Sequence, residues 1–139
     1  MAAPAAMTRA ASVAAVVATV IATLGAAACG GSEPQGVFTQ SVCPPVDPPT
    51  YASFGMQLVE RYCTSCHDSA KTGTQRGGAP LTIDFDTLSL LRMWTSQIDK
   101  QAAFGPAAEN QLMPPAGKPA PTDDERRILG EYIACEVAN

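Results

Sequence analysis

The sequence is short of histidine, of basic residues and of alternating apolar patterns. It has 1 histidine in 139 residues, so two histidines of this chain cannot bind the same metal ion. Lysine and arginine number 9 against 13 acidic residues, and the net charge of -4 argues against nucleic-acid binding, which uses a basic face. The length excludes a large multidomain enzyme. Because no segment alternates apolar and polar residues for long, we expect an all-α fold.

The N-terminus has the pattern of a secretion signal. Arg9 precedes residues 10–28, which carry no charge and end in three alanines. We therefore expect residues 1–28 to be a signal peptide. Cys29, which follows, resembles the cysteine that is acylated in bacterial lipoproteins. This predicts a protein anchored by lipid on the periplasmic side of a bacterial membrane. Plain secretion to the periplasm and an uncleaved membrane anchor are the alternatives.

Residues 29–50 are rich in proline, with glycine, serine, glutamate and glutamine between the prolines. Proline at this density blocks both helix and central strand and keeps a chain extended. We expect a tether that connects the membrane anchor to a folded domain at residues 51–139. The prolines are Pro34, Pro44, Pro45, Pro48 and Pro49.

The domain carries apolar stripes at helical spacing. Helices are expected over residues 52–62, over residues 86–104 with Asp86 as the cap, and after a capping box that begins at Thr122. Segment 68–79 reads as a loop. The three apolar faces are Phe54, Leu58 and Tyr62; Leu88, Leu91, Trp94, Ile98 and Ala102; and Ile128, Leu129, Tyr132 and Ile133. Helices this short bury little surface, so a cofactor or a cross-link is expected to complete the core.

The first predicted helix ends in the sequence Cys63-Thr64-Ser65-Cys66-His67. Cys-x-x-Cys-His is the attachment signature of c-type haem. Two thiols about one helical turn apart can reach one edge of a porphyrin, and the adjacent histidine then lies under the iron. The sequence therefore predicts one covalent haem c on Cys63 and Cys66, with His67 as an iron ligand.

Two other uses of this motif compete with haem attachment. A thioredoxin-like Cys-x-x-Cys follows a strand and opens a helix, whereas this one closes a helix in a chain without predicted strands. A structural zinc site needs four ligands, which His67 and three of the cysteines could supply. Zinc would leave the loop-rich middle of the domain without a core.

A second axial ligand must come from another part of the chain. Beyond the signal, the methionines are Met56, Met93 and Met113. Met56 lies too close to Cys63 to reach the opposite face of the haem, and Met93 lies in the middle of a predicted helix. Met113 lies in a loop stiffened by two prolines, so we predict it as the ligand, with a packing role as the alternative. A thioether opposite an imidazole raises the haem potential.

The segment from about Gly55 to Val137 resembles a class I cytochrome c domain, of the monohaem type found in bacterial secreted proteins and lipoproteins. Besides the haem motif, it shares Gly55 and the residues that the family's last helix packs against that glycine, Leu129 and Tyr132. Val59 stands where the family has an aromatic residue. The resemblance implies a small fold of three main helices wrapped around the haem.

The resemblance also implies contacts around the haem. In the family, a proline carbonyl accepts a hydrogen bond from Nδ1 of the haem-ligating histidine, and Pro80 matches that proline. Leu81 is then expected against the haem. Trp94 is expected in the core, packed on the haem or close to a haem propionate.

With both axial positions filled, no small-molecule substrate reaches the iron. The sequence therefore predicts an electron-transfer protein, not an enzyme, that exchanges electrons with redox partner proteins. The alternatives are a haem-bearing subunit of a larger respiratory or oxidative complex, and a haem-based redox or ligand sensor if Met113 does not bind iron.

Cys43 and Cys135 have no role in this scheme. An even pair of cysteines outside the cytoplasm is usually oxidised. The family's crossing of the last helix over Gly55 would bring Cys135 close to the start of the first helix and to Cys43. We expect an intramolecular disulfide between them. A buried thiol at Cys135 and a bridge from Cys43 to another chain are the alternatives.

Overall fold

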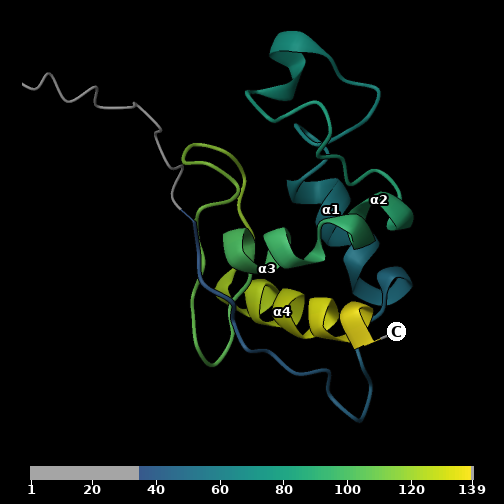
Figure 1. The fold of residues 1–139 in the computed structure, drawn as a ribbon, viewed down its shortest axis with the longest axis vertical. Coiled ribbons are helices and arrows are strands. Elements are labelled where there is room, and N and C mark those ends of the chain that lie inside the picture. The colour runs from purple at the N-terminus through teal and green to yellow at the C-terminus, as the bar shows by residue number, and fades with distance from the viewer. Residues whose placement is uncertain (1–34, 139) are drawn as a thin grey trace, which may run out of the picture. The chain divides into compact units, whose positions relative to one another are not determined.

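Helices and long loops, without a β-strand, make up residues 35–138, which are the residues that the structure, a computed structural model, describes. One isolated β-bridge joins Phe104 to Glu109. The helical elements are η1 Tyr51–Gly55, α1 Met56–Tyr62, η2 Gly73–Arg76, α2 Leu88–Met93, α3 Thr95–Ala102 and α4 Asp123–Ala138 (Figure 1). The predicted all-α class is confirmed for this part of the chain. The predicted signal peptide 1–28 and Cys29 lie outside it.

The π-helical turn η1 and helix α1 together form the first predicted helix. Thr50 begins it with a capping box. The Thr50 hydroxyl accepts a hydrogen bond from Ser53 N at 3.1 Å, and Ser53 Oγ accepts one from Thr50 N at 2.9 Å. Leu58 and Tyr62 of the predicted apolar stripe are buried. This helix therefore begins and ends close to its predicted bounds.

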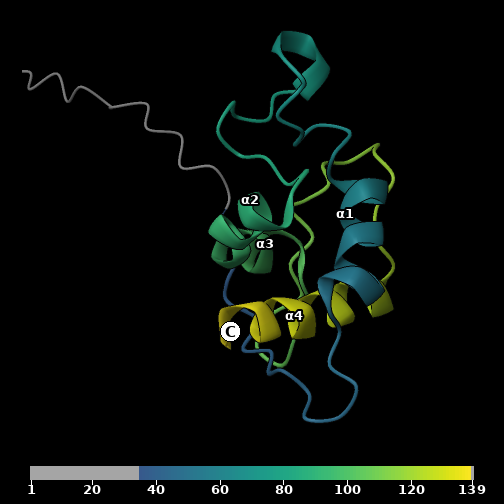
Figure 2. The ribbon, with the colours of Figure 1, turned by 90° about the vertical axis from the view of Figure 1, so that its right-hand side faces the viewer.

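Helix α4 crosses the first helix (Figure 2). The crossing lies at Gly55. A Cβ atom at Gly55 would lie 2.8 Å from Cζ of Tyr132, so glycine is what allows the two helices to approach this closely. Tyr132 is fully buried, and its ring centroid lies 6.4 Å from that of Phe54. The contact between Gly55 and Tyr132 is the one that the sequence analysis expects.

The core lies where α1, α3 and α4 meet. Helix α3 packs along α4, and the residues of both contribute to one buried apolar cluster. The cluster comprises Leu58, Val59, Tyr62, Phe85, Leu91, Ile98, Ala102, Ala103, Leu129, Tyr132 and Ile133.

The second predicted helix, residues 86–104, is wrong in its bounds and its continuity. Thr87, not Asp86, caps α2, because both carboxylate oxygens of Asp86 accept hydrogen bonds from Ser69, at 3.1 and 2.8 Å. The chain then leaves helical geometry at Trp94, which separates α2 from α3. The hydroxyl of Thr95 donates to the carbonyl oxygen of Arg92 at 3.3 Å, and such local bonds commonly bend helices.

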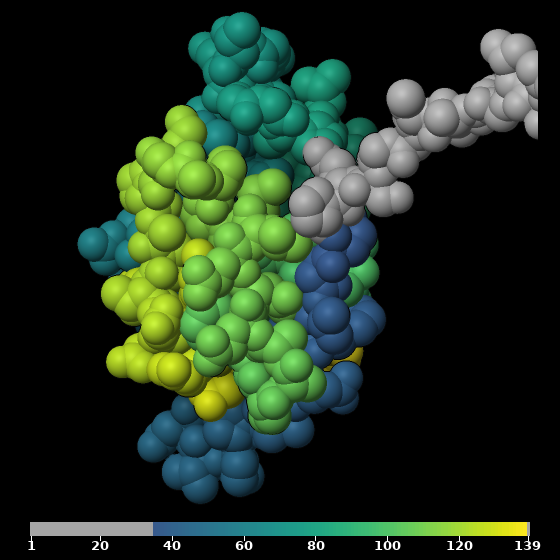
Figure 3. Space-filling view, turned by 90° about the vertical axis from the view of Figure 1, so that its left-hand side faces the viewer, coloured from purple at the N-terminus to yellow at the C-terminus, as the bar shows by residue number. Residues whose placement is uncertain are grey.

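Residues 36–43 form an N-terminal arm that belongs to the folded unit, although they lie within the predicted tether 29–50 and before the predicted domain start at 51. Thr39 is 1% exposed. Its backbone N and its Oγ1 donate to the two carboxylate oxygens of Asp99, at 2.9 and 2.5 Å. Val37 and Asn110 exchange hydrogen bonds at 3.2 and 2.7 Å. Figure 3 shows the arm in blue against the green surface of α3 and the segment that follows α3.

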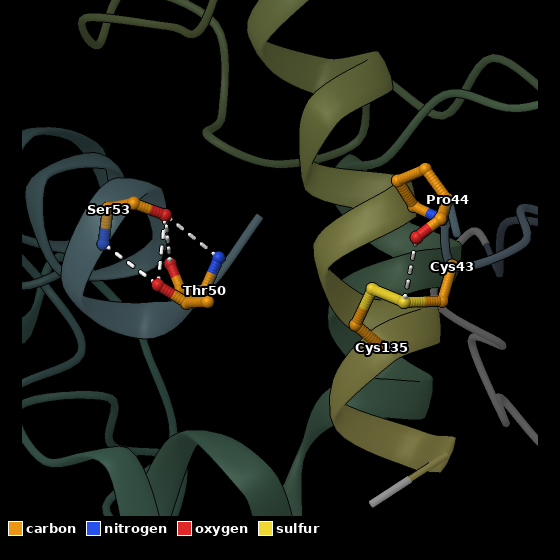
Figure 4. The surroundings of a disulfide bond; sticks show 5 residues. All are labelled: Cys43, Pro44, Thr50, Ser53 and Cys135. Atoms are coloured by element: carbon orange, nitrogen blue, oxygen red, sulfur yellow. Dashed lines mark hydrogen bonds between the residues drawn. A yellow bond between two sulfur atoms is a disulfide. The ribbon is translucent and has the colours of Figure 1, made fainter. Parts of the chain in front are cut away.

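A disulfide joins the end of this arm to α4. Cys43 and Cys135 are bonded, with their Cα atoms 4.6 Å apart, although 92 positions separate them in the chain (Figure 4). This is the intramolecular pairing that the sequence analysis expects. Together with the hydrogen bonds of Thr39, the disulfide attaches the arm to both α3 and α4.

Candidate functional site

A cavity of about 460 Å³ lies between α1, α3 and the proline-containing loop 112–121. Its volume lies within the range of roughly 300–1,000 Å³ that is usual for pockets holding small ligands and cofactors. Apolar side chains line much of it. They are Leu58, Ile83, Phe85, Ile98, Leu112 and Leu129.

The four residues predicted to hold the haem and its iron all line this cavity: Cys63, Cys66, His67 and Met113. Cys63 ends α1, and the chain then turns so that both Cys66 N and His67 N donate to the carbonyl oxygen of Cys63, at 3.0 and 2.9 Å. This turn is what places the two thiols and the imidazole at one cavity. Met113 comes from 46 residues later in the chain.

Both thiols of the motif are free in the structure. Burial raises the pKa of the Cys63 thiol to about 12, and the positive charge of Arg126 lowers it by less. Cys63 is therefore a neutral thiol at pH 7. A disulfide between Cys63 and Cys66 is absent, although the same structure joins Cys43 to Cys135.

The imidazole of His67 is oriented by a backbone carbonyl and an aromatic ring. Nδ1 lies 2.8 Å from the carbonyl oxygen of Ile83, and the ring stacks on Phe85 with centroids 4.6 Å apart. Because a carbonyl only accepts hydrogen bonds, the proton lies on Nδ1 and Nε2 keeps its lone pair. Burial lowers the pKa of His67, which favours the neutral form that binds metals.

The predicted roles of Pro80 and Leu81 are corrected. The carbonyl oxygen of Pro80 accepts a hydrogen bond from Nη2 of Arg76 at 2.5 Å, and the carbonyl of Ile83 takes the bond from His67 instead. Pro80 still lines the cavity. Leu81 is 70% exposed, and Ile83, two positions later, is the aliphatic residue that lines the cavity there.

Arg76, which sequence reasoning missed, organises the loop between the motif and α2. It is 2% exposed, and its Nη1 lies 2.8 Å from Oδ1 of Asp84, which is also buried. The guanidinium donates to four backbone carbonyls at 2.5 to 3.1 Å, those of Asp68, Ala79, Pro80 and Ile83. The only sequence signal is a charged residue inside a stretch otherwise rich in glycine and threonine, which also describes a solvated loop.

Met113 differs from the other two methionines in its surroundings. Met56 and Met93 lie on helices, whereas Met113 lies in a loop; Met113 is 40% exposed, about as much as Met56. Met113 lines the cavity, and its backbone N donates to the carbonyl oxygen of Gln101 at 2.8 Å. The elimination made from the sequence therefore selects the methionine that the fold brings to Cys63, Cys66 and His67.

Trp94 also lines the cavity and has an unused hydrogen-bond donor. Its Nε1 is buried, with no hydrogen-bond partner in the described part of the chain. Buried donors in proteins are nearly always paired, so an acceptor is expected from a group that occupies the cavity. Gln97 and Gln101 of α3 and Lys118 of the following loop add further donors to the lining.

The zinc alternative loses two of its ligands. Cys43 and Cys135 are joined in the disulfide, so Cys63, Cys66 and His67 are the cysteine and histidine ligands that remain among residues 35–138. Within residues 35–138, no group of three or more His, Cys, Asp or Glu side chains is arranged to hold a metal ion.

The comparisons with known proteins name no relative. No protein-family model, curated protein or solved structure matches this chain. Among the described residues, no helix is long and apolar enough to cross a membrane.

Proposed function

We propose that this chain is an electron-transfer protein that carries one covalent c-type haem, and that it is not an enzyme. The observation that carries the proposal is the convergence of Cys63, Cys66, His67 and Met113 on one cavity. Cys63 and Cys66 would hold the haem by thioether bonds, and His67 and Met113 would be the two axial ligands of its iron.

The chemistry of the cavity fits such a group. Apolar side chains from three helices suit a flat macrocycle, and the unpaired Nε1 of Trp94 suits a propionate oxygen. His67 presents an unprotonated Nε2, because its Nδ1 is committed to Ile83. Each class of donor that a haem requires is therefore present at this site.

Bound haem iron supplies one-electron exchange between its ferrous and ferric states. The residues of the chain would hold the haem and bind its iron. An imidazole and a thioether that fill both axial positions leave no place for a substrate, which favours electron transfer over catalysis or ligand sensing. Electrons would pass to and from redox partner proteins docked at the surface, and the membrane anchor predicted at Cys29 would place the domain in the periplasm.

The test is covalent haem on a denaturing gel. The protein produced in cells that mature c-type cytochromes should give a band that stains for haem peroxidase activity, and an intact mass greater than the polypeptide by one haem. Cys63→Ser/Cys66→Ser should lose the stain. Cys43→Ser/Cys135→Ser, which removes the same number of thiols away from the motif, should keep it. A wild-type protein without added mass would refute the proposal.

A further inference from the structure

Two positively polarised donors share one backbone carbonyl beside the cavity. His67 Nδ1 lies 2.8 Å from the carbonyl oxygen of Ile83, and Nη2 of Arg76 lies 3.0 Å from the same oxygen. A carbonyl oxygen has two lone pairs and can accept both bonds. The acceptor that orients His67 is therefore also bound to a guanidinium.

Arg76 is built into the protein rather than resting on its surface. It is 2% exposed and is paired with Asp84 at 2.8 Å. Its further bonds to the carbonyls of Asp68, Ala79 and Pro80 leave the guanidinium little freedom to move away from Ile83. Because breaking a buried ion pair leaves an uncompensated buried charge, Asp84 also holds the guanidinium in place.

The bond that a metal-binding histidine donates from its far nitrogen controls its strength as a ligand. A strong acceptor at Nδ1 makes the imidazole more basic and so favours the more highly charged metal ion. A guanidinium that also donates a hydrogen bond to this oxygen makes the oxygen a weaker acceptor for Nδ1. The carboxylate of Asp84 opposes the charge of Arg76, so the weakened acceptor is the effect that favours the ferrous state.

We propose that Arg76 is a positioning residue that acts through the Ile83 carbonyl to limit the donor strength of His67 and so raises the reduction potential of the bound haem. This inference rests on the proposed function. It assigns to the loop between the haem motif and α2 a role in tuning the potential, in addition to enclosing the cavity.

The main test removes both charges of the buried pair. Arg76→Gln/Asp84→Asn leaves no unpaired charge, and the shorter glutamine amide cannot span the five backbone carbonyls that Arg76 reaches. The reduction equilibrium should shift about tenfold toward the ferric state, which corresponds to a potential lower by ~60 mV for one electron. In the ferrous protein, the Nδ1–H proton of His67 should move downfield, because Ile83 then accepts mainly from His67.

The matched control is the ion pair between Arg92 and Glu136. Its Nε and Oε2 atoms lie 2.6 Å apart, and neither residue lines the cavity. Arg92→Gln/Glu136→Gln removes the same two charges and should leave both the potential and the His67 proton signal unchanged. Equal potentials in the two double variants would overturn the proposal, even with haem attached to both.

If Arg76→Gln/Asp84→Asn does not bind haem, a second variant tests the proposal. Arg76→Lys keeps the positive charge beside Asp84 but loses the planar fork that reaches Ile83. It should lower the potential in the same direction by a few-fold change in the equilibrium. A potential equal to that of the wild type would overturn the proposal. A wild-type protein without haem would refute the proposed function and, with it, the role of Arg76.

Discussion

Arg126 donates a hydrogen bond from Nη1 to the carbonyl oxygen of Met113 at 2.9 Å. The same nitrogen lies 2.6 Å from the carbonyl oxygen of Ala102 and 3.1 Å from that of Asn110. The buried guanidinium of Arg126 on α4 therefore binds both the end of α3 and the segment that leads to Met113. Since the N of Met113 also bonds to Gln101, the backbone of Met113 is held through both its donor and its acceptor.

Replacing Arg126 by leucine should lower the free energy of unfolding by about 2–4 kcal/mol, because three carbonyls lose a buried charged donor. Urea unfolding measures this loss. The control is the next residue, Arg127, whose side chain is 53% exposed and pairs with Asp124. Arg127→Leu should cost less than about 1 kcal/mol. Equal losses in the two variants would contradict a structural role for Arg126.

Replacing Met113 by alanine should change the haem spectrum without removing the haem. The sulfur-to-iron charge-transfer band of the ferric protein should disappear, the potential should fall, and carbon monoxide should bind the ferrous iron. Met93→Ala, at an exposed position on α2, is the control and should change none of these. An unchanged spectrum in Met113→Ala would exclude Met113 as the ligand and would revive the sensor alternative.

The disulfide should be a major source of stability. It closes a loop across 92 positions, for which the chain-entropy model gives up to ~4–5 kcal/mol. Cys43→Ser/Cys135→Ser should unfold at lower urea concentration, by an amount similar to that caused by reductant on the wild type. Thiol titration of the haem-loaded, unfolded and unreduced protein should find neither Cys43 nor Cys135 reactive; two reactive thiols would argue against the bond.

Adding a methyl group at Gly55 should disturb the crossing of α4 over the first helix. The new Cβ would lie 2.8 Å from Tyr132, so Gly55→Ala should destabilise the protein by about 1–3 kcal/mol. The companion variant is Gly55→Ala/Tyr132→Leu, in which a smaller side chain faces the methyl group. In a double-mutant cycle the two changes should be coupled, and simple additivity would place the strain elsewhere.

A protein acylated at Cys29 should partition into the detergent phase when membranes are extracted. Membranes from cells that express the wild type should release it into the detergent phase, whereas Cys29→Ser should appear in the aqueous phase. Cys43→Ser serves as the control for loss of a cysteine and should remain in the detergent phase. Retention of Cys29→Ser in membranes would instead indicate an uncleaved N-terminal anchor.

The residues that could be predicted are those whose signal is local in the sequence. Cys63, Cys66 and His67 occupy five consecutive positions, and the helical stripes repeat within one or two turns. Met113 can be predicted as the ligand because only Met56 and Met93 are alternatives beyond the signal. The contact between Gly55 and Tyr132 follows from the resemblance to class I cytochrome c domains and not from a local pattern.

The residues that the sequence does not predict are polar. Nothing in composition distinguishes Arg76 or Arg126 from a solvated arginine, since most of their partners are backbone carbonyls, which every residue carries. The prolines on either side of residues 36–43 predict a tether there, whereas the arm docks through hydrogen bonds to distant residues. Thr39 bonds to Asp99, which lies 60 positions away, and no local pattern records that pairing.

The docked arm also limits how far the domain can reach. With the chain held from Gly36 onward, only the seven peptide links from Cys29 remain, and they span at most about 25 Å when fully extended. For a protein acylated at Cys29, the haem domain would therefore occupy a thin layer next to the lipid. Partners in the same membrane would meet it at a high effective concentration, and the rate of electron exchange would follow their density per unit area rather than their concentration in the periplasm.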